Sequence, residues 1–262
     1  MQQMPVLPGL SRLDPGRTCS NCRNCRNNTL CLPVAVASSE WMRLEAIIEP
    51  MQPVAAGAHL FSSGDRFTAL YAIHSGSIKT CVGSEAGVQH ITGFHLPAEL
   101  TGFDGIASGI HTNDGVAMET TTVCRIPYLQ LLQLMRKLPS LQHHLLWLLG
   151  RRIAGDFRIF RALNTKCAVA RVALMLVGLS QRFQARRYSA SSYRLPMTRG
   201  DIGNYLGLEI ETISRALSAL HAAGAVEIAG REVHINDLAL LKRISQQAGA
   251  ADSAEVGDNR YR

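Results

Sequence analysis

The sequence predicts an α+β protein in which an antiparallel β-roll is followed by a long helix and a winged helix-turn-helix. Three patterns lead to this fold. Short apolar stretches separated by glycines fill 51–128, a long amphipathic helical pattern covers 140–165, and a helix–glycine–helix–hairpin pattern lies within 166–245. The 262 residues are enough for two domains with separate cores. Hydrophobic residues at 47% and charged residues at 18% are ordinary for globular proteins and exclude a broadly disordered chain.

The N-terminal stretch 1–17 carries three prolines and two glycines without periodicity, which predicts a flexible tail. It lacks a basic start followed by an apolar core, unlike a secretory signal. No apolar run reaches the roughly 18 residues that a membrane span needs. We therefore expect a cytoplasmic protein without a membrane segment.

Cysteines crowd the segment 18–33, where four of the seven occur: Cys19, Cys22, Cys25 and Cys31. In a cytosolic protein such crowding indicates metal or redox chemistry rather than a disulfide framework. The residues alone leave an iron–sulfur cluster and a structural zinc ion equally open, because a single CxxC pair with scattered cysteines fits either.

The first domain is expected to span 34–139. A short helix is predicted over 38–48, with Ser38 or Ser39 as its N-cap, and another between Pro127 and Pro139. Between them, strand-like segments recur about every ten residues with turn signals, as in a roll or barrel. Two cysteines in apolar contexts are expected to be buried packing residues, and three histidines to be roll residues: Cys81, Cys167, His74, His90 and His95.

The long helix is predicted over 140–165, with Ser140 as its N-cap. Six side chains at alternating spacings of three and four form a seam with one charged member: Leu146, Leu149, Ile153, Asp156, Phe160 and Leu163. A helix buried inside a monomer shows a wider apolar stripe, so this spacing favours a homodimer seam. Two facing Asp156 carboxylates would repel and keep the dimer marginal.

The second domain, 166–245, carries eleven Lys and Arg against six Asp and Glu, a net charge of +5. Thr198 and Asp201 form a capping-box start, Gly207 suits a sharp turn, and Gly203 is small where two helices would cross. A second helix over 209–222 and two apolar strands at 226–228 and 233–235 complete a winged helix-turn-helix. The remaining residues, 246–262, read as a second flexible tail.

The second helix presents side chains that suit a major groove. Arg215 can bond guanine, Glu211 can accept from cytosine, and Ser214 can contact a base or a phosphate. Thr198 and Arg199, at the start of the preceding helix, are also expected to contact DNA. A solvated face with a Glu211–Arg215 pair would look similar. The glycine turn, the wing and the net charge favour double-stranded DNA.

Several motifs resemble those of the FNR branch of the CRP/FNR transcription regulators. They read MTRGDIGNYLGL-x-x-ETISR at 197–215, LYAIHSGSIKT at 70–80, HITGFHL at 90–96 and VCRIP at 123–127. The resemblance implies a roll like those that bind cyclic nucleotides, a dimerisation helix and a winged helix-turn-helix. It also implies that Glu211, Ser214 and Arg215 read TTGAT half-sites in a TTGAT-N4-ATCAA palindrome. Glu209 stands where a hydroxyl residue is usual, so we expect the cap of this helix to differ from the family pattern.

The same resemblance implies a 4Fe–4S cluster on Cys22, Cys25, Cys31 and the distant Cys124. Cys19 stays an alternative ligand because Cys19, Cys22 and Cys25 form overlapping triads. Leu30 would shield the cluster. Arg23 and Arg26 depart from the family pattern, and a cationic flank is expected to stabilise the reduced cluster.

What the protein would do also follows from the resemblance. An oxygen-labile cluster would promote dimerisation and DNA binding, and so regulate anaerobic genes. The loop 83–87 would contact RNA polymerase.

Two other classes are disfavoured. A buried cyclic-nucleotide phosphate needs a cationic partner, but no Lys or Arg occurs between Lys79 and Arg125, and Asn113–Asp114–Gly115 stands where the arginine would fall. We therefore expect no cyclic nucleotide. An iron–sulfur enzyme would need a substrate motif, and we identify none, so the protein is not expected to be an enzyme.

Overall fold

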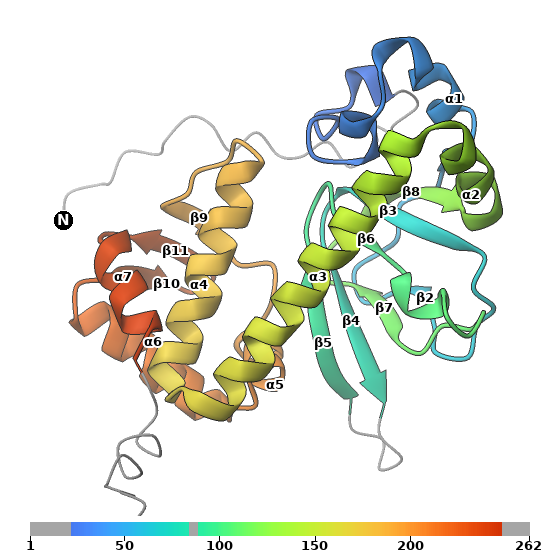
Figure 1. The fold of residues 1–262 in the computed structure, drawn as a ribbon. Coiled ribbons are helices and arrows are strands. Elements are labelled where there is room, and N and C mark those ends of the chain that lie inside the picture. The colour runs from blue at the N-terminus through green and yellow to red at the C-terminus, as the bar shows by residue number, and fades with distance from the viewer. Residues whose placement is uncertain (1–21, 84–88, 248–262) are drawn as a thin grey trace, which may run out of the picture.

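The computed structural model describes residues 22–83 and 89–247 (Figure 1). The predicted tail 1–17, the predicted tail 246–262 from residue 248 onward, Cys19, and the loop 83–87 except Gly83 lie outside the described residues. No helix in the described ranges is long and apolar enough to cross a membrane.

The N-terminal domain is the predicted antiparallel roll, in which the described residues form two four-stranded sheets with the orders β1-β8-β3-β6 and β2-β7-β4-β5. Alternate side chains of these strands meet between the sheets, where Ile73, Ile78 and Val123 are buried. The strands are β1 (Glu49–Pro50), β2 (His59–Phe61), β3 (Ala69–Ser75), β4 (Ile78–Gly83), β5 (Gln89–His95), β6 (Leu100–Thr101), β7 (Asp114–Ala117) and β8 (Thr122–Pro127).

Short helical turns precede, interrupt and follow the strands of the roll along the chain. The predicted helix 38–48 is shorter than expected, and neither serine caps it: Ser38 and Ser39 lie inside a 3-10 turn that Ala37 precedes. The turns and helices are η1 (Cys22–Asn24), η2 (Leu32–Ala35), η3 (Ser38–Glu40), α1 (Trp41–Glu45), η4 (Phe103–Gly105) and α2 (Tyr128–Lys137).

The long helix α3 spans Pro139–Thr165, 27 residues and thus about 40 Å. Ser140 is not its N-cap, because the helix begins one residue earlier at Pro139 and Leu138 holds the cap position. A proline suits the first helical position, where its missing N–H leaves no hydrogen bond unmade. Figure 1 shows α3 running between the two domains, from the cysteine segment to the start of the C-terminal domain.

The C-terminal domain is the predicted winged helix-turn-helix. Gly207 has a positive φ of 61° at the end of α5, and a Cβ on Gly203 would lie 2.5 Å from the Leu208 carbonyl oxygen. Strand β9 joins the wing as a third strand that the sequence pattern did not predict. The elements are α4 (Ala168–Ala185), β9 (Ser192–Arg194), α5 (Arg199–Leu206), α6 (Ile210–Ala222), β10 (Val226–Ala229), β11 (Glu232–Ile235) and α7 (Leu238–Ser245).

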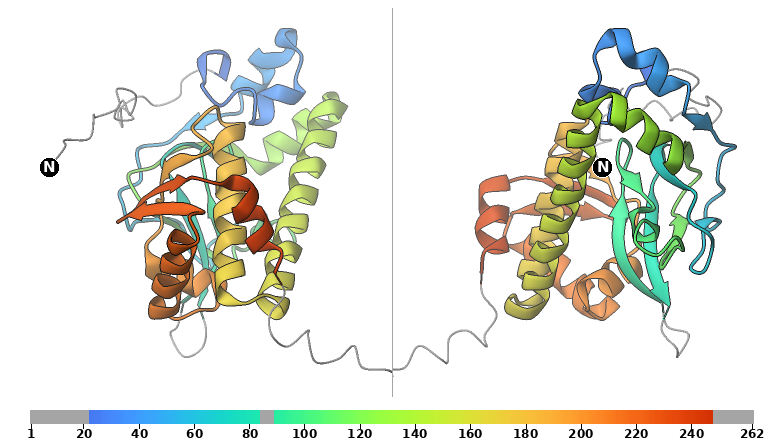
Figure 2. Two further views of the ribbon diagram at one scale, coloured as in Figure 1. Left: turned by 90° about the vertical axis from the view of Figure 1, so that its left-hand side faces the viewer. Right: turned by 45° about the vertical axis from the view of Figure 1, so that its right-hand side comes forward.

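The two domains share a core. Phe94 and Leu96, at the end of β5, are buried in the same apolar cluster as Leu176 of α4 and Ile202 of α5. Figure 2 shows from two sides that the C-terminal domain lies beside the roll. Side chains of the roll thereby become part of the packing of the helix-turn-helix.

Candidate functional site

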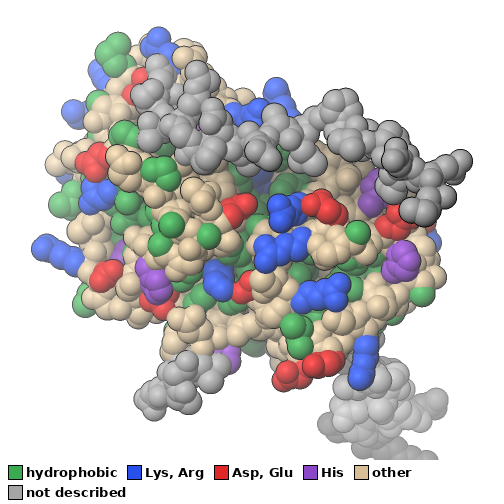
Figure 3. Space-filling view, turned by 180° about the vertical axis from the view of Figure 1, so that it is seen from behind, with side chains coloured by type: hydrophobic (Ala, Val, Ile, Leu, Met, Phe, Trp, Pro, Cys, Tyr) green, Lys and Arg blue, Asp and Glu red, His purple; other side chains and the backbone are tan. Residues whose placement is uncertain are grey.

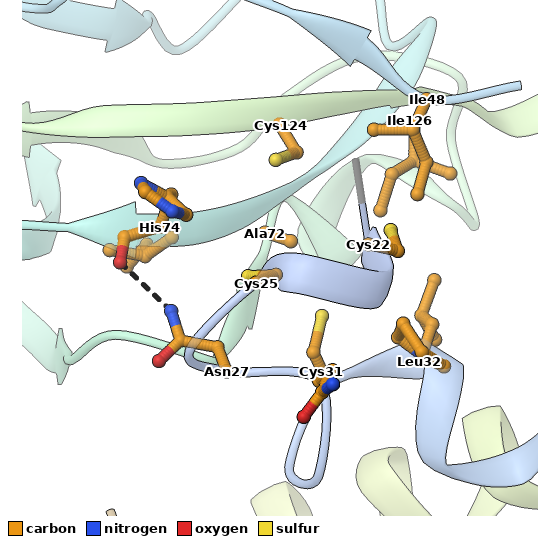
Figure 4. Close-up of a pocket in the computed structure, with 13 residues that line it drawn as sticks. Cys22, Cys25, Asn27, Cys31, Leu32, Ile48, Ala72, His74, Cys124 and Ile126 are labelled. Atoms are coloured by element: carbon orange, nitrogen blue, oxygen red, sulfur yellow. Dashed lines mark hydrogen bonds between the residues drawn. The ribbon is translucent and has the colours of Figure 1, made fainter. Parts of the chain in front are cut away.

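Cys22, Cys25, Cys31 and Cys124 line one cavity between the N-terminal segment and the roll (Figure 4). The first three come from η1 and the loop that follows, and Cys124 comes from strand β8. The other lining residues are Asn27, Asn28, Leu32, Pro33, Ile48, Ala72, Ile73, His74 and Ile126. The structure thus brings together four cysteines that lie up to 102 positions apart.

Hydrogen bonds fix this loop against the roll. Asn27 is only 6% exposed, and its side-chain Nδ2 donates to the His74 carbonyl oxygen at 2.8 Å. The Cys31 backbone N–H donates to the Asn27 carbonyl oxygen at 3.0 Å, which closes the turn that leads into the third cysteine. Asn27 therefore positions the loop without itself being a ligand candidate.

The neighbours of the cysteines differ partly from expectation. Leu30 is half-buried before Cys31 but is not among the lining residues, whereas Leu32 and Ile126 form apolar walls. Arg23 and Arg26 are exposed beside the loop. His74 lines the cavity.

The donor set can be compared with two kinds of metal group. Zinc–sulfur bonds of about 2.3 Å place the sulfurs of a tetrahedral site about 4 Å apart. Among the described residues, no group of three or more His, Cys, Asp or Glu side chains is placed to hold a metal ion. A cubane spreads its four thiolates more widely than a single ion does, and thiolates suit iron–sulfur clusters. Four cysteines around one apolar-walled cavity match the four-thiolate ligand set of an iron–sulfur cluster.

The remaining cysteines and His95 lie elsewhere. Cys81 is buried on β4, as expected, and burial raises the pKa of its thiol. Cys167 is exposed, contrary to expectation, because it precedes α4 at the surface turn from α3. His95 is 4% exposed, and its ring contacts the Arg152 guanidinium of α3.

The cysteine loop leads directly into α3. The turn η2 begins at the residue after Cys31 and contacts α3. Leu32 is 1% exposed and belongs to the same apolar cluster as Cys124 and as Leu141 and Leu145 of α3. Cys31 also packs against this cluster. Two candidate ligands, Cys31 and Cys124, therefore share one packed core with the long helix.

An apolar stripe on α3 is open to solvent in the single chain. Leu146 is 60% exposed, Ile153 54%, Phe157 68% and Phe160 67%. At 3.6 residues per turn these four lie on one face, and Phe157 joins the predicted seam one turn after Ile153. Three other predicted members flank the stripe: Leu149 and Leu163 are half-buried, and Asp156 is exposed.

Helix α6 presents the predicted recognition residues. Glu211 and Arg215 are exposed, and Ser214, half-buried, donates its hydroxyl to the Ile210 carbonyl oxygen at 3.0 Å. Arg199 donates to the Ser214 hydroxyl oxygen at 3.3 Å, which joins the start of α5 to α6.

The ends of these two helices differ. Thr198 and Asp201 form the predicted capping box of α5, whereas Glu209 precedes α6 without a side-chain cap.

Seen from behind, Lys and Arg side chains lie interspersed with Asp and Glu (Figure 3). On that face, charge alone does not mark a nucleic-acid surface.

Comparison with known families matches both domains. Residues 170–244 match the Crp-like helix-turn-helix domain, and residues 51–138 match the cyclic nucleotide-binding domain. Among solved structures, FixK2 from Bradyrhizobium japonicum has a TM-score of 0.69 and 25% identity over 78% of this chain and 100% of that chain.

Curated relatives align over nearly the whole chain. The fumarate nitrate reduction regulatory protein of Klebsiella oxytoca is 40% identical over 91% of this chain and 96% of its own length. The transcriptional activator protein anr of Pseudomonas aeruginosa is 40% identical over 83% of this chain and 89% of its own length. The chain belongs to the FNR branch of the CRP/FNR family of transcription regulators.

Proposed function

We propose that this protein is a DNA-binding regulator of anaerobic gene expression that responds to oxygen through a 4Fe–4S cluster. The observation that carries the proposal is one cavity lined by Cys22, Cys25, Cys31 and Cys124, in which the lining residue Leu32 also packs against α3. Relatives named for anaerobic and fumarate–nitrate regulation support the physiological assignment. None of the names quoted above denotes an enzyme, and we infer a cytoplasmic regulator without catalytic activity.

Cys22, Cys25, Cys31 and Cys124 would hold the cluster, with Cys19 as an alternative ligand. When bound, the cluster supplies an oxygen-sensitive tie between the N-terminal loop and strand β8. Leu32, Ile48 and Ile126 exclude water around the thiolates, because they line the same cavity. Leu30 would add shielding from the outer side of the loop.

The loop acts on dimerisation through packing. Leu32 follows Cys31 directly and is packed with Leu141 and Leu145, so a shift of the loop repacks the first turns of α3. A ligand that favours one packing by about 3 kcal/mol changes an association constant more than a hundredfold. Loss of the tie would therefore loosen the dimer.

The homodimer would form along the α3 stripe. Burying an apolar side chain the size of Leu146, Ile153, Phe157 or Phe160 contributes about 1.5–3 kcal/mol. The half-buried Leu149 and Leu163 flank this surface and would complete it. The repulsion between two Asp156 carboxylates opposes the association by a few kcal/mol at most. The net free energy of dimerisation is therefore small enough that a change in the packing of the cysteine loop shifts the equilibrium between monomer and dimer.

DNA recognition would use both helices of the helix-turn-helix. Exposed Glu211 and Arg215, with Ser214, would read a half-site similar to TTGAT in the major groove. Exposed Thr198 and Arg199 lie at the N-terminus of α5, where backbone amides and a cation suit a phosphate. A two-fold dimer would bind the palindrome TTGAT-N4-ATCAA and activate or repress through RNA polymerase.

The alternative sensors are less well supported. A cyclic nucleotide would meet a carboxylate, because Asp104 accepts hydrogen bonds from the backbone N–H groups of Thr112 and Asn113 near the position of the missing arginine. Structural zinc modules usually carry two CxxC pairs, whereas among the described cysteines only Cys22 and Cys25 have that spacing.

The proposal is tested by anaerobic purification, visible absorption near 420 nm, iron and sulfide analysis, and a gel shift on the palindrome before and after air exposure. We expect about four irons per chain and DNA binding that falls in air. Cys124→Ser should lose the colour. Its matched control, Cys81→Ser, changes another buried strand cysteine and should keep it. A colourless, zinc-loaded protein that binds equally in air would contradict the sensing mechanism.

A further inference from the structure

Helix α5 covers the exposed edge of strand β5. The Asn204 Nδ2 donates to the Gln89 carbonyl oxygen at 2.7 Å, and its Oδ1 accepts from the Ile91 backbone N–H at 2.6 Å. Strand β5 is the last of the described strands in its sheet, so these two backbone groups have no neighbouring strand on that side. One side-chain amide thus replaces the hydrogen bonds that a further strand would make.

Two other contacts lie beside this one. The Lys79 Nζ of β4 lies 2.7 Å from the Asp201 Oδ1, and both side chains are largely shielded, at 24% and 16% exposed. Asp201 is also the capping-box residue of α5, so the same carboxylate fixes the start of the helix and its attachment to the roll. The rings of Phe94 and Tyr205 pack edge to face at 5.0 Å.

The contact between α5 and β5 does not cover the side chains that are proposed to bind DNA. Ile202 and Leu206 of α5 are buried, whereas Arg199, Glu211 and Arg215 are exposed while the helix is attached to the roll. The attachment therefore holds the helix-turn-helix without covering its recognition surface. Because the roll also contacts α3 through Arg152, the orientation of α6 is fixed relative to the α3 stripe.

We propose that this α5–β5 interface sets the half-site spacing that the dimer accepts, with Lys79 and Asn204 as positioning residues. The inference rests on the proposed binding of a palindrome by a dimer. One added base pair rotates the second half-site by about 35° and moves it by about 3.4 Å. A rigidly attached helix-turn-helix discriminates against that change, and a loosened one tolerates it.

The test measures binding of the full chain, under anaerobic conditions, to labelled palindromes with N3, N4 and N5 spacers by fluorescence anisotropy. Lys79→Met keeps the aliphatic stem and removes the charge, and Lys137→Met is its control at an exposed position of helix α2. Asn204→Ala removes both amide hydrogen bonds. We expect each interface variant to bind the N4 duplex about three- to tenfold more weakly. In both interface variants the ratio of the N5 to the N4 dissociation constant should fall toward one. In the Lys137→Met control this ratio should stay at the wild-type value.

An unchanged spacer profile in both interface variants would overturn the inference, as would tighter N4 binding, which would mean that the attached orientation opposes DNA binding. Failure of the wild-type chain to bind any palindrome would instead contradict the proposed function. Hydrogen exchange of the Ile91 amide tests the interface without DNA. We expect protection in the wild type and at least tenfold faster exchange in Asn204→Ala. Fast exchange in the wild type would overturn the inference whatever the DNA result.

Discussion

The Arg152 Nε lies 3.0 Å from the Asp156 Oδ2, one turn further along α3. The same guanidinium donates to the Thr92 carbonyl oxygen at 3.3 Å and contacts the His95 ring at 3.2 Å. Asp156 therefore has a counter-ion at the flank of the α3 stripe before a second copy approaches. Two such carboxylates repel less across a dimer than two unpaired ones would.

Replacement of Asp156 tests its role at the seam. We expect Asp156→Ala to remove the repulsion, dimerise in air and bind DNA there, as measured by sedimentation and gel shift. Arg152→Ala should uncover the charge and weaken dimerisation about two- to fivefold, since an exposed pair contributes about 0.2–1 kcal/mol. The Arg152 effect should shrink when Asp156→Ala is already present. Sedimentation of Asp156→Ala as a monomer only would refute the seam charge as a control element.

His95 makes stability depend on pH. Burial, and next the Arg152 charge, lowers the pKa of His95 to about 3, with Glu99 opposing and Arg182 adding to the shift. Below about pH 6.5, His95 binds a proton in the unfolded chain but stays neutral in the folded chain. The stability contributed by neutral His95 is therefore fully present above pH 6.5 and is lost as the pH falls toward 3. From pH 6.5 to 5 the loss should be about 1.5 kcal/mol.

Urea unfolding at the two pH values measures this loss. Burial opposes the ionisation of Glu99, but Arg182 and Arg186 lower its pKa to about 2, so Glu99 titrates mainly below this window. His95→Gln should reduce the pH dependence, and His90→Gln, which changes an exposed histidine of the same strand, should not. An equal slope in both variants would exclude His95 as the source.

Glu209 is a weak start for the recognition helix, because it holds the cap position of α6 without a side-chain hydrogen bond. Threonine can accept a hydrogen bond from a backbone N–H in the first turn. Glu209→Thr should therefore raise the free energy of unfolding by about 0.5–1 kcal/mol. Glu227→Thr, at an exposed position of strand β10, serves as the control in chemical denaturation. Equal or lower stability than wild type would show that the cap is satisfied in another way.

Two helical glycines should respond oppositely to alanine. A Cβ on Gly203 would lie 2.5 Å from a backbone oxygen, so Gly203→Ala must separate α5 from the turn and should abolish DNA binding. Among the described residues, nothing beyond its own helix backbone and chain neighbours lies within 4 Å of a Cβ added at Gly178 in α4, so Gly178→Ala should stabilise by about 0.5–1 kcal/mol. Thermal unfolding and a gel shift distinguish them. Normal DNA binding by Gly203→Ala would refute the close helix approach.

Local rules predicted what neighbouring residues determine. The capping box at Thr198, the left-handed turn at Gly207 and the wing depend on contacts within a few positions, and all are present. The prediction that Ser140 is the N-cap of α3 was wrong, because Pro139 begins the helix one residue earlier. Phe157 was omitted from the seam because a strict heptad excludes it, although its spacing of four from Ile153 was a usable signal.

Such local rules do not predict contacts between residues that are far apart in the sequence. Lys79 and Asp201 are 122 residues apart, and a lone lysine in a strand carries no sign of its partner. Cys167 was expected to be buried because its neighbours are apolar, but a surface turn exposes it. The gathering of Cys124 with the N-terminal cysteines was expected only through the family resemblance, since spacing alone does not connect β8 to the loop.

The Asn204 contact also has a consequence for synthesis on the ribosome. Ile91 is translated 113 residues before the asparagine that covers it. At about 5–20 residues per second, the β5 edge stays uncovered for about 6–23 s after it emerges. During that interval the nascent roll presents a strand edge able to pair with another nascent chain. Truncation before α5 would make that exposure permanent, and such fragments should aggregate where the full chain does not.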